Sequence, residues 1–396
     1  MRHPTLLLIA VISRIGSGLA ASLTVLYVTQ FAGLHLRTVG ITLTIATAIA
    51  VSASIWIGHL SDRLGARDMY IGMFALQAIA TGALVQVRSV PAYAIVVLAL
   101  AVADLGARSS QGAVIHAVVP SADRLAVRAT VRVAANLGFA VGAALGSLVL
   151  TVGTPQAFRA GLLTTAALIF CTGLLIFRLP RVPAATSGAS ASWAVLRDRP
   201  FVLFMGLNGV LNIHNTMLTV ALPLWIATRT NAPHWMVSVI LVVNAATVVL
   251  CQLRLTRGTD ALPGAARAAR RSGLLLALSC LILATTSATS TPVTITLLIL
   301  AALAHVTGEI LESASGWSTS YALAPPGLIG QYQGAHAMGR GTGNLLGPTL
   351  FTAIALPLGP TGWLLTATLF TAAGLLTPVI LRRAQPAVPE HETATS

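Results

Sequence analysis

The sequence is poor in charged residues and has no lysine. Charged residues make up 9% of the 396-residue chain and hydrophobic residues 56%, with a mean hydropathy of +0.84. In soluble domains about 25% of residues are charged, and a chain with so few polar groups does not cover itself in water. The composition therefore excludes a soluble globular protein and indicates one embedded in a membrane.

Cysteine patterns and catalytic patterns are also missing. The three cysteines, Cys171, Cys251 and Cys280, lie in apolar runs without paired spacing or nearby metal ligands. This excludes a disulfide framework and a cysteine-based metal site. The sequence contains no nucleophile–base set and no phosphate-cradling loop, so we expect no enzymatic activity, no cofactor and no metal.

The 24 basic residues are all arginine and, against 10 acidic residues, give a net charge of +14. Some basic chains bind nucleic acid. Here the arginines lie in short segments between apolar runs, without a basic tail or an aromatic-studded patch. The excess of positive charge on the cytoplasmic side of membrane proteins explains them better, so we expect a lipid bilayer, and no nucleic acid, as partner.

Twelve apolar stretches are long enough to cross a bilayer, which takes about 20 helical residues. They predict helices, because backbone amides in lipid need internal hydrogen bonds and no stretch alternates apolar and polar residues as a barrel strand does. The predicted spans are 5–31, 39–57, 69–87, 91–118, 133–152, 157–177, 200–228, 235–253, 272–289, 292–322, 336–358 and 361–381.

The distribution of arginine predicts the orientation of these spans. Eighteen of the 24 arginines lie in segments on one side and four on the other, while Arg14 and Arg108 lie within spans. Positively charged segments stay in the cytoplasm, so we expect a multi-pass protein of the plasma membrane with both termini cytoplasmic. The N-terminus lacks an A-x-A cleavage site and indicates a retained first span, with a signal peptide as the alternative.

The chain divides near its middle. A small-residue stretch rich in proline, glycine and serine follows Arg181 and resembles a flexible linker. A shift of 205 residues aligns Asp104 with Glu309 and Gly138 with Gly343, as expected of parallel halves. We predict an N-terminal six-helix bundle over 1–178, a cytoplasmic linker over 179–199, a C-terminal six-helix bundle over 200–383 and a disordered cytoplasmic tail over 384–396.

Residues 58–67 form a short charged turn between the second and third spans, Gly-His-Leu-Ser-Asp-Arg-Leu-Gly-Ala-Arg. The turn resembles the signature loop of the major facilitator superfamily, G-x-L-x-D-R-x-G-R-R, with Ala66 in place of an arginine. The resemblance implies an all-α polytopic membrane protein with the major facilitator fold, two pseudo-symmetric six-helix bundles with twelve transmembrane helices.

In that family the signature loop stabilises the outward-facing state of a solute transporter. We expect Asp62 to accept backbone N–H groups at a helix N-terminus, and Arg63 and Arg67 to meet acids or carbonyl ends across the gap between the halves. The candidate residues of this conformational gate are Gly58, Asp62, Arg63, Gly65 and Arg67.

Polar residues recur at helical spacing inside four predicted spans. An ionisable group at bilayer depth costs a few kcal/mol, so each should face a partner or a water-filled cavity. In the family that this chain resembles, helices one, four, seven and ten line the central cavity, and the polar stripes fall on the same four. The stripes are Arg14 and Ser17; Asp104, Arg108 and Gln111; Asn208, Asn212 and Asn215; and His305, Glu309 and Glu312.

The intramembrane acids suggest proton coupling. Three acids face two arginines in the spans, so one acid lacks a guanidinium partner. Glu309 and Glu312 lie three residues apart, and both repulsion and burial favour their protonated form. We hypothesise that one of them binds the coupling proton and that His305 tunes it. The alternative is a permanent salt bridge between Glu309 and Arg14.

The other stripes also carry two interpretations. Arg108-Ser109-Ser110-Gln111-Gly112 resembles the R-x-x-Q-G motif of proton-coupled antiporters, in which the arginine is tied to proton transfer; the alternative is chance or helix packing. Asp104 can pair with Arg108 along the helix. The asparagines of the seventh span line a substrate cavity together with Gln111, or they only join neighbouring helices by hydrogen bonds worth about 0.6 to 2 kcal/mol.

Glycine recurs every four residues in the fifth and eleventh spans, a spacing that lets helix backbones approach closely. Drug antiporters of the superfamily carry a G-x-x-x-G-P type motif on the fifth span. This chain has no proline there, and the similar sequence occupies the eleventh span, where proline favours a kink. The residues expected to serve helix packing are Gly138, Gly142, Gly343, Gly347 and Pro348.

The resemblance implies secondary active transport by alternating access. We expect a monomer that carries out proton-coupled efflux of a small organic molecule, a drug or natural product of amphipathic or cationic character. The alternatives are a proton-coupled importer of a nutrient such as a sugar or organic acid, and a non-transporting membrane receptor or scaffold.

Overall fold

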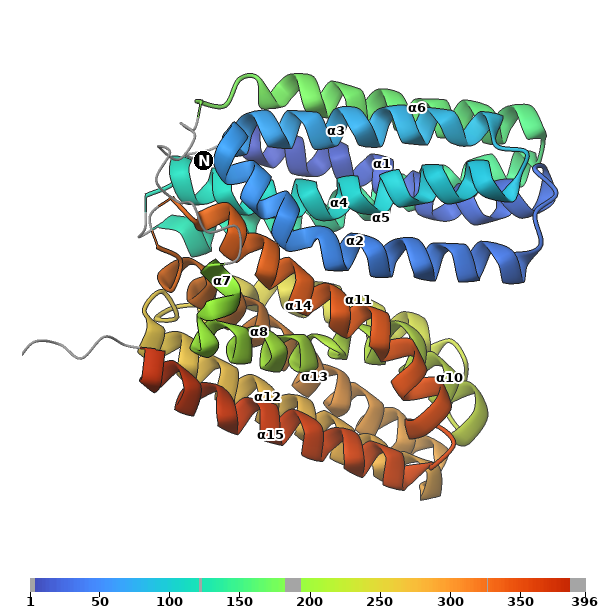
Figure 1. Ribbon diagram of the computed structural model, residues 1–396. Coiled ribbons are helices and arrows are strands. Elements are labelled where there is room, and N and C mark those ends of the chain that lie inside the picture. Colours follow the sequence, from blue (N-terminus) through green and yellow to red (C-terminus); the bar gives the residue numbers. More distant parts are fainter. Residues whose placement is uncertain (1–3, 121–122, 182–193, 326, 385–396) are drawn as a thin grey trace, which may run out of the picture. The chain divides into compact units, whose positions relative to one another are not determined.

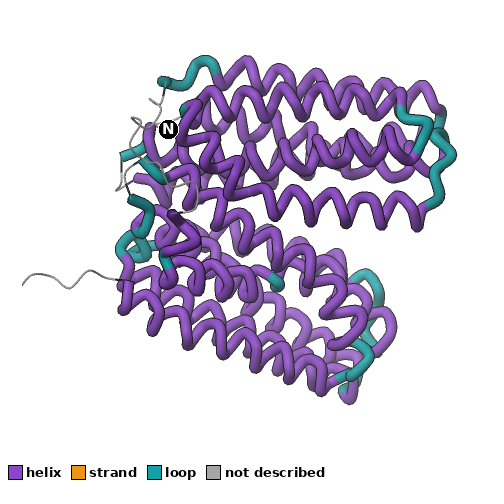
Figure 2. Tube along the Cα trace, viewed as in Figure 1, coloured by secondary structure: helices purple, strands orange, loops and turns teal. Residues whose placement is uncertain are grey.

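The computed structural model describes residues 4–120, 123–181, 194–325 and 327–384. Almost all of these residues lie in helices, and no strand occurs among them (Figures 1 and 2). The predicted fold class, an all-α membrane protein, is thereby confirmed. Most of the predicted linker and nearly all of the predicted tail, residues 182–193 and 385–396, lie outside the described residues.

The first six helices follow the first six predicted spans. Two of them begin at side-chain caps: Ser89 accepts a hydrogen bond from the backbone N–H of Ala92, and Thr154 accepts one from that of Ala157. Each cap is followed by a proline, whose missing N–H is no loss in a first turn. These helices are α1 (Pro4–Gln30), α2 (Leu36–Leu64), α3 (Ala66–Ala83), α4 (Val90–Val118), α5 (Arg124–Val152) and α6 (Pro155–Ile176).

The second half of the chain is less regular. Two predicted spans contain π-helical turns, at Met217–Ala221 and at Leu350–Ala355. The α-helices are α7 (Ala194–Arg197), α8 (Arg199–Asn212), α9 (His214–Thr216), α10 (Leu222–Arg229), α11 (Met236–Leu255), α12 (Leu262–Thr285), α13 (Thr291–Ala322), α14 (Ile329–Thr349) and α15 (Pro360–Ala384).

Eleven helical segments within the described ranges are long and apolar enough to cross a membrane, by length and composition. The remaining predicted span, 336–358, corresponds to α14 and the π-helical turn that follows it. The first half of α14 is polar, with Gln331, Gln333 and His336 buried, which explains why it falls short of the hydropathy of the others.

Several helices are longer than the predicted spans. α5 begins at Arg124 rather than at 133, and α12 at Leu262 rather than at 272. Arginines that the sequence places in loops therefore lie in helical turns. The apolar runs mark only the part that crosses the hydrocarbon, and each helix continues beyond it because its backbone hydrogen bonds are internal in either medium.

The charged segment 58–67 is not the turn that its composition predicts. α2 continues to Leu64 and α3 begins at Ala66, so Gly65 alone separates the two helices. Gly65 has φ 91° and ψ 133°, a backbone conformation that glycine adopts without the steric cost of a side chain. Gly58, Asp62 and Arg63 are therefore helical, because the chain changes direction only at Gly65.

The seventh predicted span is interrupted rather than continuous. α8 ends at Asn212, and the short α9 and the π-helical turn separate it from α10. The three asparagines of this span therefore do not lie along one regular helix. π-helical turns are rare in proteins, and those that occur often lie at functional sites.

The chain forms two compact units. Unit 1 takes its described residues from Met1–Ser192, Val248–Leu253 and Ala324–Leu345, and unit 2 from Trp193–Thr247, Arg254–Leu323 and Leu346–Ser396. The units thus follow the two halves of the chain, except that a short part of α11 and most of α14 belong to unit 1.

Close helix contacts hold unit 1 together. α1 packs against α5 and α6, and α4 packs against α2 and α3. A methyl group at Gly142 would overlap the backbone carbonyl of Ile15, and one at Gly138 would lie 2.5 Å from the carbonyl oxygen of Val11. The absence of side chains at these two positions lets the backbones of α1 and α5 touch.

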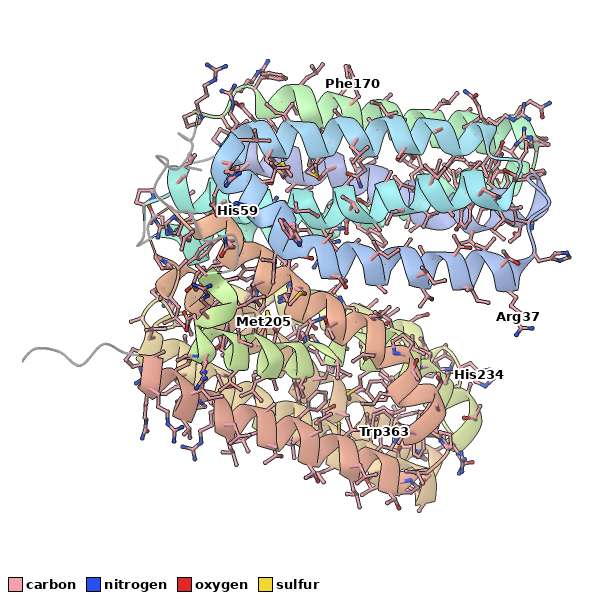
Figure 3. All side chains as sticks on the ribbon, in the orientation of Figure 1. Arg37, His59, Phe170, Met205, His234 and Trp363 are labelled. Carbon is pink, nitrogen blue, oxygen red and sulfur yellow. The ribbon has the colours of Figure 1, made fainter. Side chains whose placement is uncertain are left out.

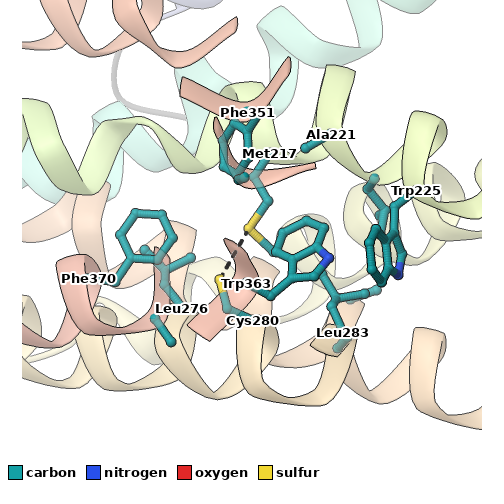
Figure 4. Packing of buried hydrophobic residues seen from close by; sticks show 14 of the residues in the cluster. Met217, Ala221, Trp225, Leu276, Cys280, Leu283, Phe351, Trp363 and Phe370 are labelled. Carbon is teal, nitrogen blue, oxygen red and sulfur yellow. Dashed lines mark hydrogen bonds between the residues drawn. The ribbon is translucent and has the colours of Figure 1, made fainter. Parts of the chain in front are cut away.

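Unit 2 has a large aromatic and aliphatic core (Figure 4). The rings of Trp225 and Trp363 pack edge to face with their centroids 5.6 Å apart, a favoured aromatic geometry. The Cys280 thiol donates to the Met217 sulfur at 3.8 Å. Cys280 is therefore part of the core, and Met217 brings the π-helical turn of the seventh span into the same core.

The end of α14 is also irregular in unit 2. Gly347 is buried there, and a methyl group at this position would overlap the side chain of Thr216. Gly343, also buried, lies in the part of α14 that belongs to unit 1. Pro348 has no backbone N–H to continue the ladder, and the π-helical turn Leu350–Ala355 follows it.

Large apolar side chains lie on outer helix surfaces. On α6, Phe170 is 56% exposed and points away from the neighbouring helices of unit 1 (Figure 3). Ile79 on α3 and Ile95 on α4 are 71% and 70% exposed. Large exposed apolar side chains on membrane-length helices fit contact with an apolar medium, here the lipid.

The α1–α5 contact can be tested with one methyl group. We expect Gly142→Ala to lower the melting temperature of the detergent-purified protein, because overpacking a closed contact costs about 1–3 kcal/mol. The matched control is Gly72→Ala on α3, where nothing lies within 4 Å; it should be neutral or slightly stabilising, since alanine favours a helix over glycine by about 1 kcal/mol. Equal melting temperatures for both variants would contradict the close contact.

Candidate functional site

Polar side chains of α1, α3 and α4 converge on one pocket in unit 1, with a volume of about 90 Å³. That is room for a few water molecules or for one polar group of a ligand. Six of its polar lining residues are Arg14, Ser17, Gln77, Asp104, Arg108 and Gln111. The pocket thus unites the predicted polar stripes of the first and fourth spans.

Two polar pairs organise this pocket. Arg108 Nε donates to Asp104 Oδ2 at 2.9 Å, one helical turn away, and both side chains are about half exposed. Gln111 Nε2 donates to the hydroxyl of Tyr70 at 3.2 Å. Asp104 and Arg108 therefore pair along α4, as their spacing predicts.

The two acids of α13 lie in unit 2 and are both buried. Asn244 on α11 donates its amide to Glu309 Oε2 at 2.9 Å, and Asn208 on α8 donates to Glu312 Oε1 at 2.9 Å. Each carboxyl group thus has a carboxamide from a different helix. A neutral amide satisfies one oxygen of the acid without supplying the positive charge that would hold it ionised.

Two histidines complete the cluster in unit 2. His214 Nε2 lies 3.7 Å from Glu312 Oε2, and His305 Nδ1 lies 4.0 Å from Glu309 Oε2. The two rings meet edge to face with centroids 5.2 Å apart. His305 Nε2 lies 3.0 Å from the backbone oxygen of His214. Since that oxygen only accepts hydrogen bonds, Nε2 carries the proton and Nδ1 faces Glu309.

The same cluster offers possible metal ligands. One atom each of His214, His305 and Glu309 lies within 4.8 Å of the other two. Ligands of a tetrahedral zinc ion lie closer, about 3.3 Å apart, because metal–ligand distances are about 2.0 Å. Glu309 Oε2 already accepts a hydrogen bond from Asn244, whereas His214 Nε2 and His305 Nδ1 are buried without a hydrogen-bond partner.

Asp62 connects α2 to the first turn of α14 within unit 1. Its Oδ1 accepts from the backbone N–H of Gly330 at 2.6 Å, and its Oδ2 from that of Gln331 at 2.9 Å. First-turn amides have no acceptor within their own helix and favour a negative charge. The absence of side chains at Gly58 and Gly330 allows the two backbones to touch there.

The two arginines of the charged segment behave differently from one another. Arg67 Nη1 donates to the backbone oxygen of Leu179 at 3.1 Å, and its guanidinium lies 5.8 Å from the centre of the Phe177 ring. Arg67 therefore contacts the residues that directly follow α6, in its own half of the chain, where α3 packs against α6. The predicted contact across the gap between the halves is not the one observed for Arg67. Arg63 is exposed.

The family model described as Major Facilitator Superfamily matches residues 6–348 of the sequence. The chain belongs to the major facilitator superfamily. It is a membrane transporter of this type, and family and fold indicate a transporter rather than an enzyme. No curated protein matches the sequence.

Solved structures of several transporters resemble this fold. The human organic anion transporter MFSD10 is 18% identical, with a TM-score of 0.66, covering 96% of this chain and 98% of that one. A bacterial homologue of the iron transporter ferroportin is 13% identical, with a TM-score of 0.71, covering 97% and 99%. The E. coli fucose:proton symporter is 12% identical, with a TM-score of 0.66, covering 98% and 99%. At these identities the likeness concerns the fold alone.

Several residues of this major facilitator transporter's polar clusters, among them Asn244, His214, Tyr70 and Gln77, are not among the predicted site residues. Asn244 lies in the middle of an apolar span, and the cost of burying its side chain is a signal that the sequence already holds. Tyr70 and Gln77 lie on the third span, which the family resemblance does not assign to the central cavity.

Two of the asparagines predicted to line a substrate cavity bond to each other: Asn215 Nδ2 donates to Asn212 Oδ1 at 3.0 Å.

The contact between Asp62 and α14 can be measured by hydrogen exchange. We expect Asp62→Asn to speed exchange of the Gly330 and Gln331 amides about tenfold or more, because a hydrogen bond to a charged group is worth about 1.5–3 kcal/mol. Asp68→Asn removes a nearby exposed carboxylate and serves as the control. Unchanged exchange in the peptide that covers these two amides would contradict the contact.

Proposed function

We propose that this transporter couples the efflux of a small organic molecule to proton entry and that Glu309 or Glu312 carries the proton. The observation that supports this proposal is the cluster in unit 2, where each buried acid accepts a hydrogen bond from a carboxamide. An amide N–H donates to a carboxyl oxygen whether or not the acid is protonated, so this contact is compatible with both forms.

The histidines fit the same role. His305 presents Nδ1, its lone-pair nitrogen, toward Glu309, and His214 lies beside Glu312. A proton bound by either acid therefore has a neighbouring basic nitrogen at 3.7–4.0 Å. In this proposal Arg14, Asp104 and Arg108 belong to the other part of the mechanism, the binding of substrate in unit 1.

The gate proposal concerns the charged segment. Asp62 holds the first turn of α14 to α2, and the change of this contact during the cycle would open and close one side of the transporter. Alternating access in this fold moves one part of the protein against another around a central site. The protein would act as a monomer in the plasma membrane with both termini in the cytoplasm.

Direction and coupling are measured in proteoliposomes. A panel of labelled organic molecules is offered with and without a pH gradient of either sign. Substrate movement opposite to the proton gradient supports efflux by antiport, whereas movement with the gradient indicates the importer. Absence of flux for the whole panel would favour the receptor or scaffold over the proposed transporter function.

The proton carrier is tested with the substrate that the panel identifies. We expect Glu309→Gln or Glu312→Gln to abolish the part of the flux that the pH gradient drives, because glutamine keeps the shape of a protonated acid and cannot release the proton. Asp260→Asn, at an exposed position outside the spans, removes a carboxylate as a control and should leave the flux intact. Undiminished gradient-driven flux in both glutamine variants would contradict the proton role.

A further inference from the structure

The pocket in unit 1 holds more positive than negative charge. Its ionisable lining residues are Arg14, Arg108 and Asp104, besides the neutral Tyr70. The ion pair between Arg108 and Asp104, with Nε and Oδ2 at 2.9 Å, balances one guanidinium. One positive charge at bilayer depth is left over, and such a charge is costly unless an anion or water accompanies it.

Arg14 is the residue that carries this charge. It is half-buried on α1, and Asp104 and Arg108 both act on it electrostatically. Among the residues that the structure describes, Arg14 makes neither a hydrogen bond nor an ion pair. Its five N–H groups are therefore open to a ligand, in a fork whose geometry matches a carboxylate.

The neighbouring side chains restrict what else binds there. The hydroxyls of Ser13 and Ser17 donate to backbone oxygens of their own helix, Ala10 and Ser13. Tyr70 accepts a hydrogen bond from Gln111, so its own O–H proton remains for another acceptor. The pocket thus offers the donors of Arg14 and Tyr70 to an acceptor-rich group, whereas a cation would meet two guanidinium groups.

We infer that the transported molecule is an organic carboxylate whose negatively charged end binds Arg14. This inference rests on the proposed function and specifies its substrate class, in place of the amphipathic or cationic molecule that the sequence suggests. The volume of about 90 Å³ suits the carboxylate group and the atoms next to it. The rest of the molecule extends beyond the pocket of unit 1.

Binding is tested without a proton gradient, with benzoate, benzamide and benzylamine as probes on the full-length protein in lipid nanodiscs. These three have similar shape and differ in charge. Benzoate should raise the melting temperature and should shield Arg14 from modification by phenylglyoxal, as read by mass spectrometry. Benzamide and benzylamine should do neither. Absence of shielding and stabilisation by benzoate would overturn the inference.

Two substitutions should change the affinity for benzoate in opposite directions. Arg14→Gln should weaken benzoate binding about ten- to hundredfold, the worth of a charge-assisted hydrogen bond. Asp104→Asn should strengthen it, because the substitution removes the only negative charge among the pocket-lining residues. Arg37→Gln, at an exposed position on α2 (Figure 3), is the control for loss of an arginine and should leave binding unchanged. Equal affinity in the Arg14 and Arg37 variants would overturn the inference.

The measurement separates this inference from the proton role. Because binding and labelling need no gradient, loss of proton coupling in the glutamine variants would leave the benzoate result intact. Conversely, absence of shielding by benzoate counts against the inference and leaves both the proton role and the transport of another substrate class untouched.

Discussion

The interior of a bilayer supplies no water to satisfy polar groups, and this constraint governs the whole chain. It forces the backbone into helices, whose hydrogen bonds are internal. It also makes every polar side chain at membrane depth expensive unless a partner or a wet cavity receives it. The acidic side chains within the described membrane-length helices are few, and Asp104, Glu309 and Glu312 each lie in a polar cluster rather than alone.

The clusters differ in charge between the two units. In unit 1, Asp104 pairs with Arg108, and the guanidinium of Arg14 in the same pocket has no ion-pair partner among the described residues. Unit 2 buries Glu309 and Glu312 among carboxamides and histidines. In the proposed mechanism, the acidic cluster of unit 2 would bind the proton and Arg14 of unit 1 would bind the negatively charged substrate.

Much of the fold follows from the sequence, because a helix in lipid shows itself as a run of apolar residues. Eleven of the twelve predicted spans have the expected length and composition, and the spacing of Asp104 and Arg108 predicts their pairing. The ends of helices do not follow in this way. Arg124 and Leu262 start helices well before the apolar runs, since nothing in the apolar pattern records where a helix continues into water.

Contacts between helices are the part that the sequence leaves open. Helical spacing places Glu309 and Glu312 on one face, yet the partners that separate them, Asn244 and Asn208, come from two other helices. Gly65 shows the same limit on a smaller scale. The composition of segment 58–67 predicts a turn, whereas the structure has helix on both sides of Gly65 alone. Both depend on three-dimensional packing, which periodicity does not encode.

The most direct test of the account is the proton count per transported molecule. Proteoliposomes that enclose a pH-sensitive dye and carry a gradient of the identified substrate, without any imposed pH gradient, report proton movement during transport. The account predicts that substrate leaving in one direction drives protons in the other at a fixed ratio. Substrate flux with no accompanying change of internal pH would contradict it.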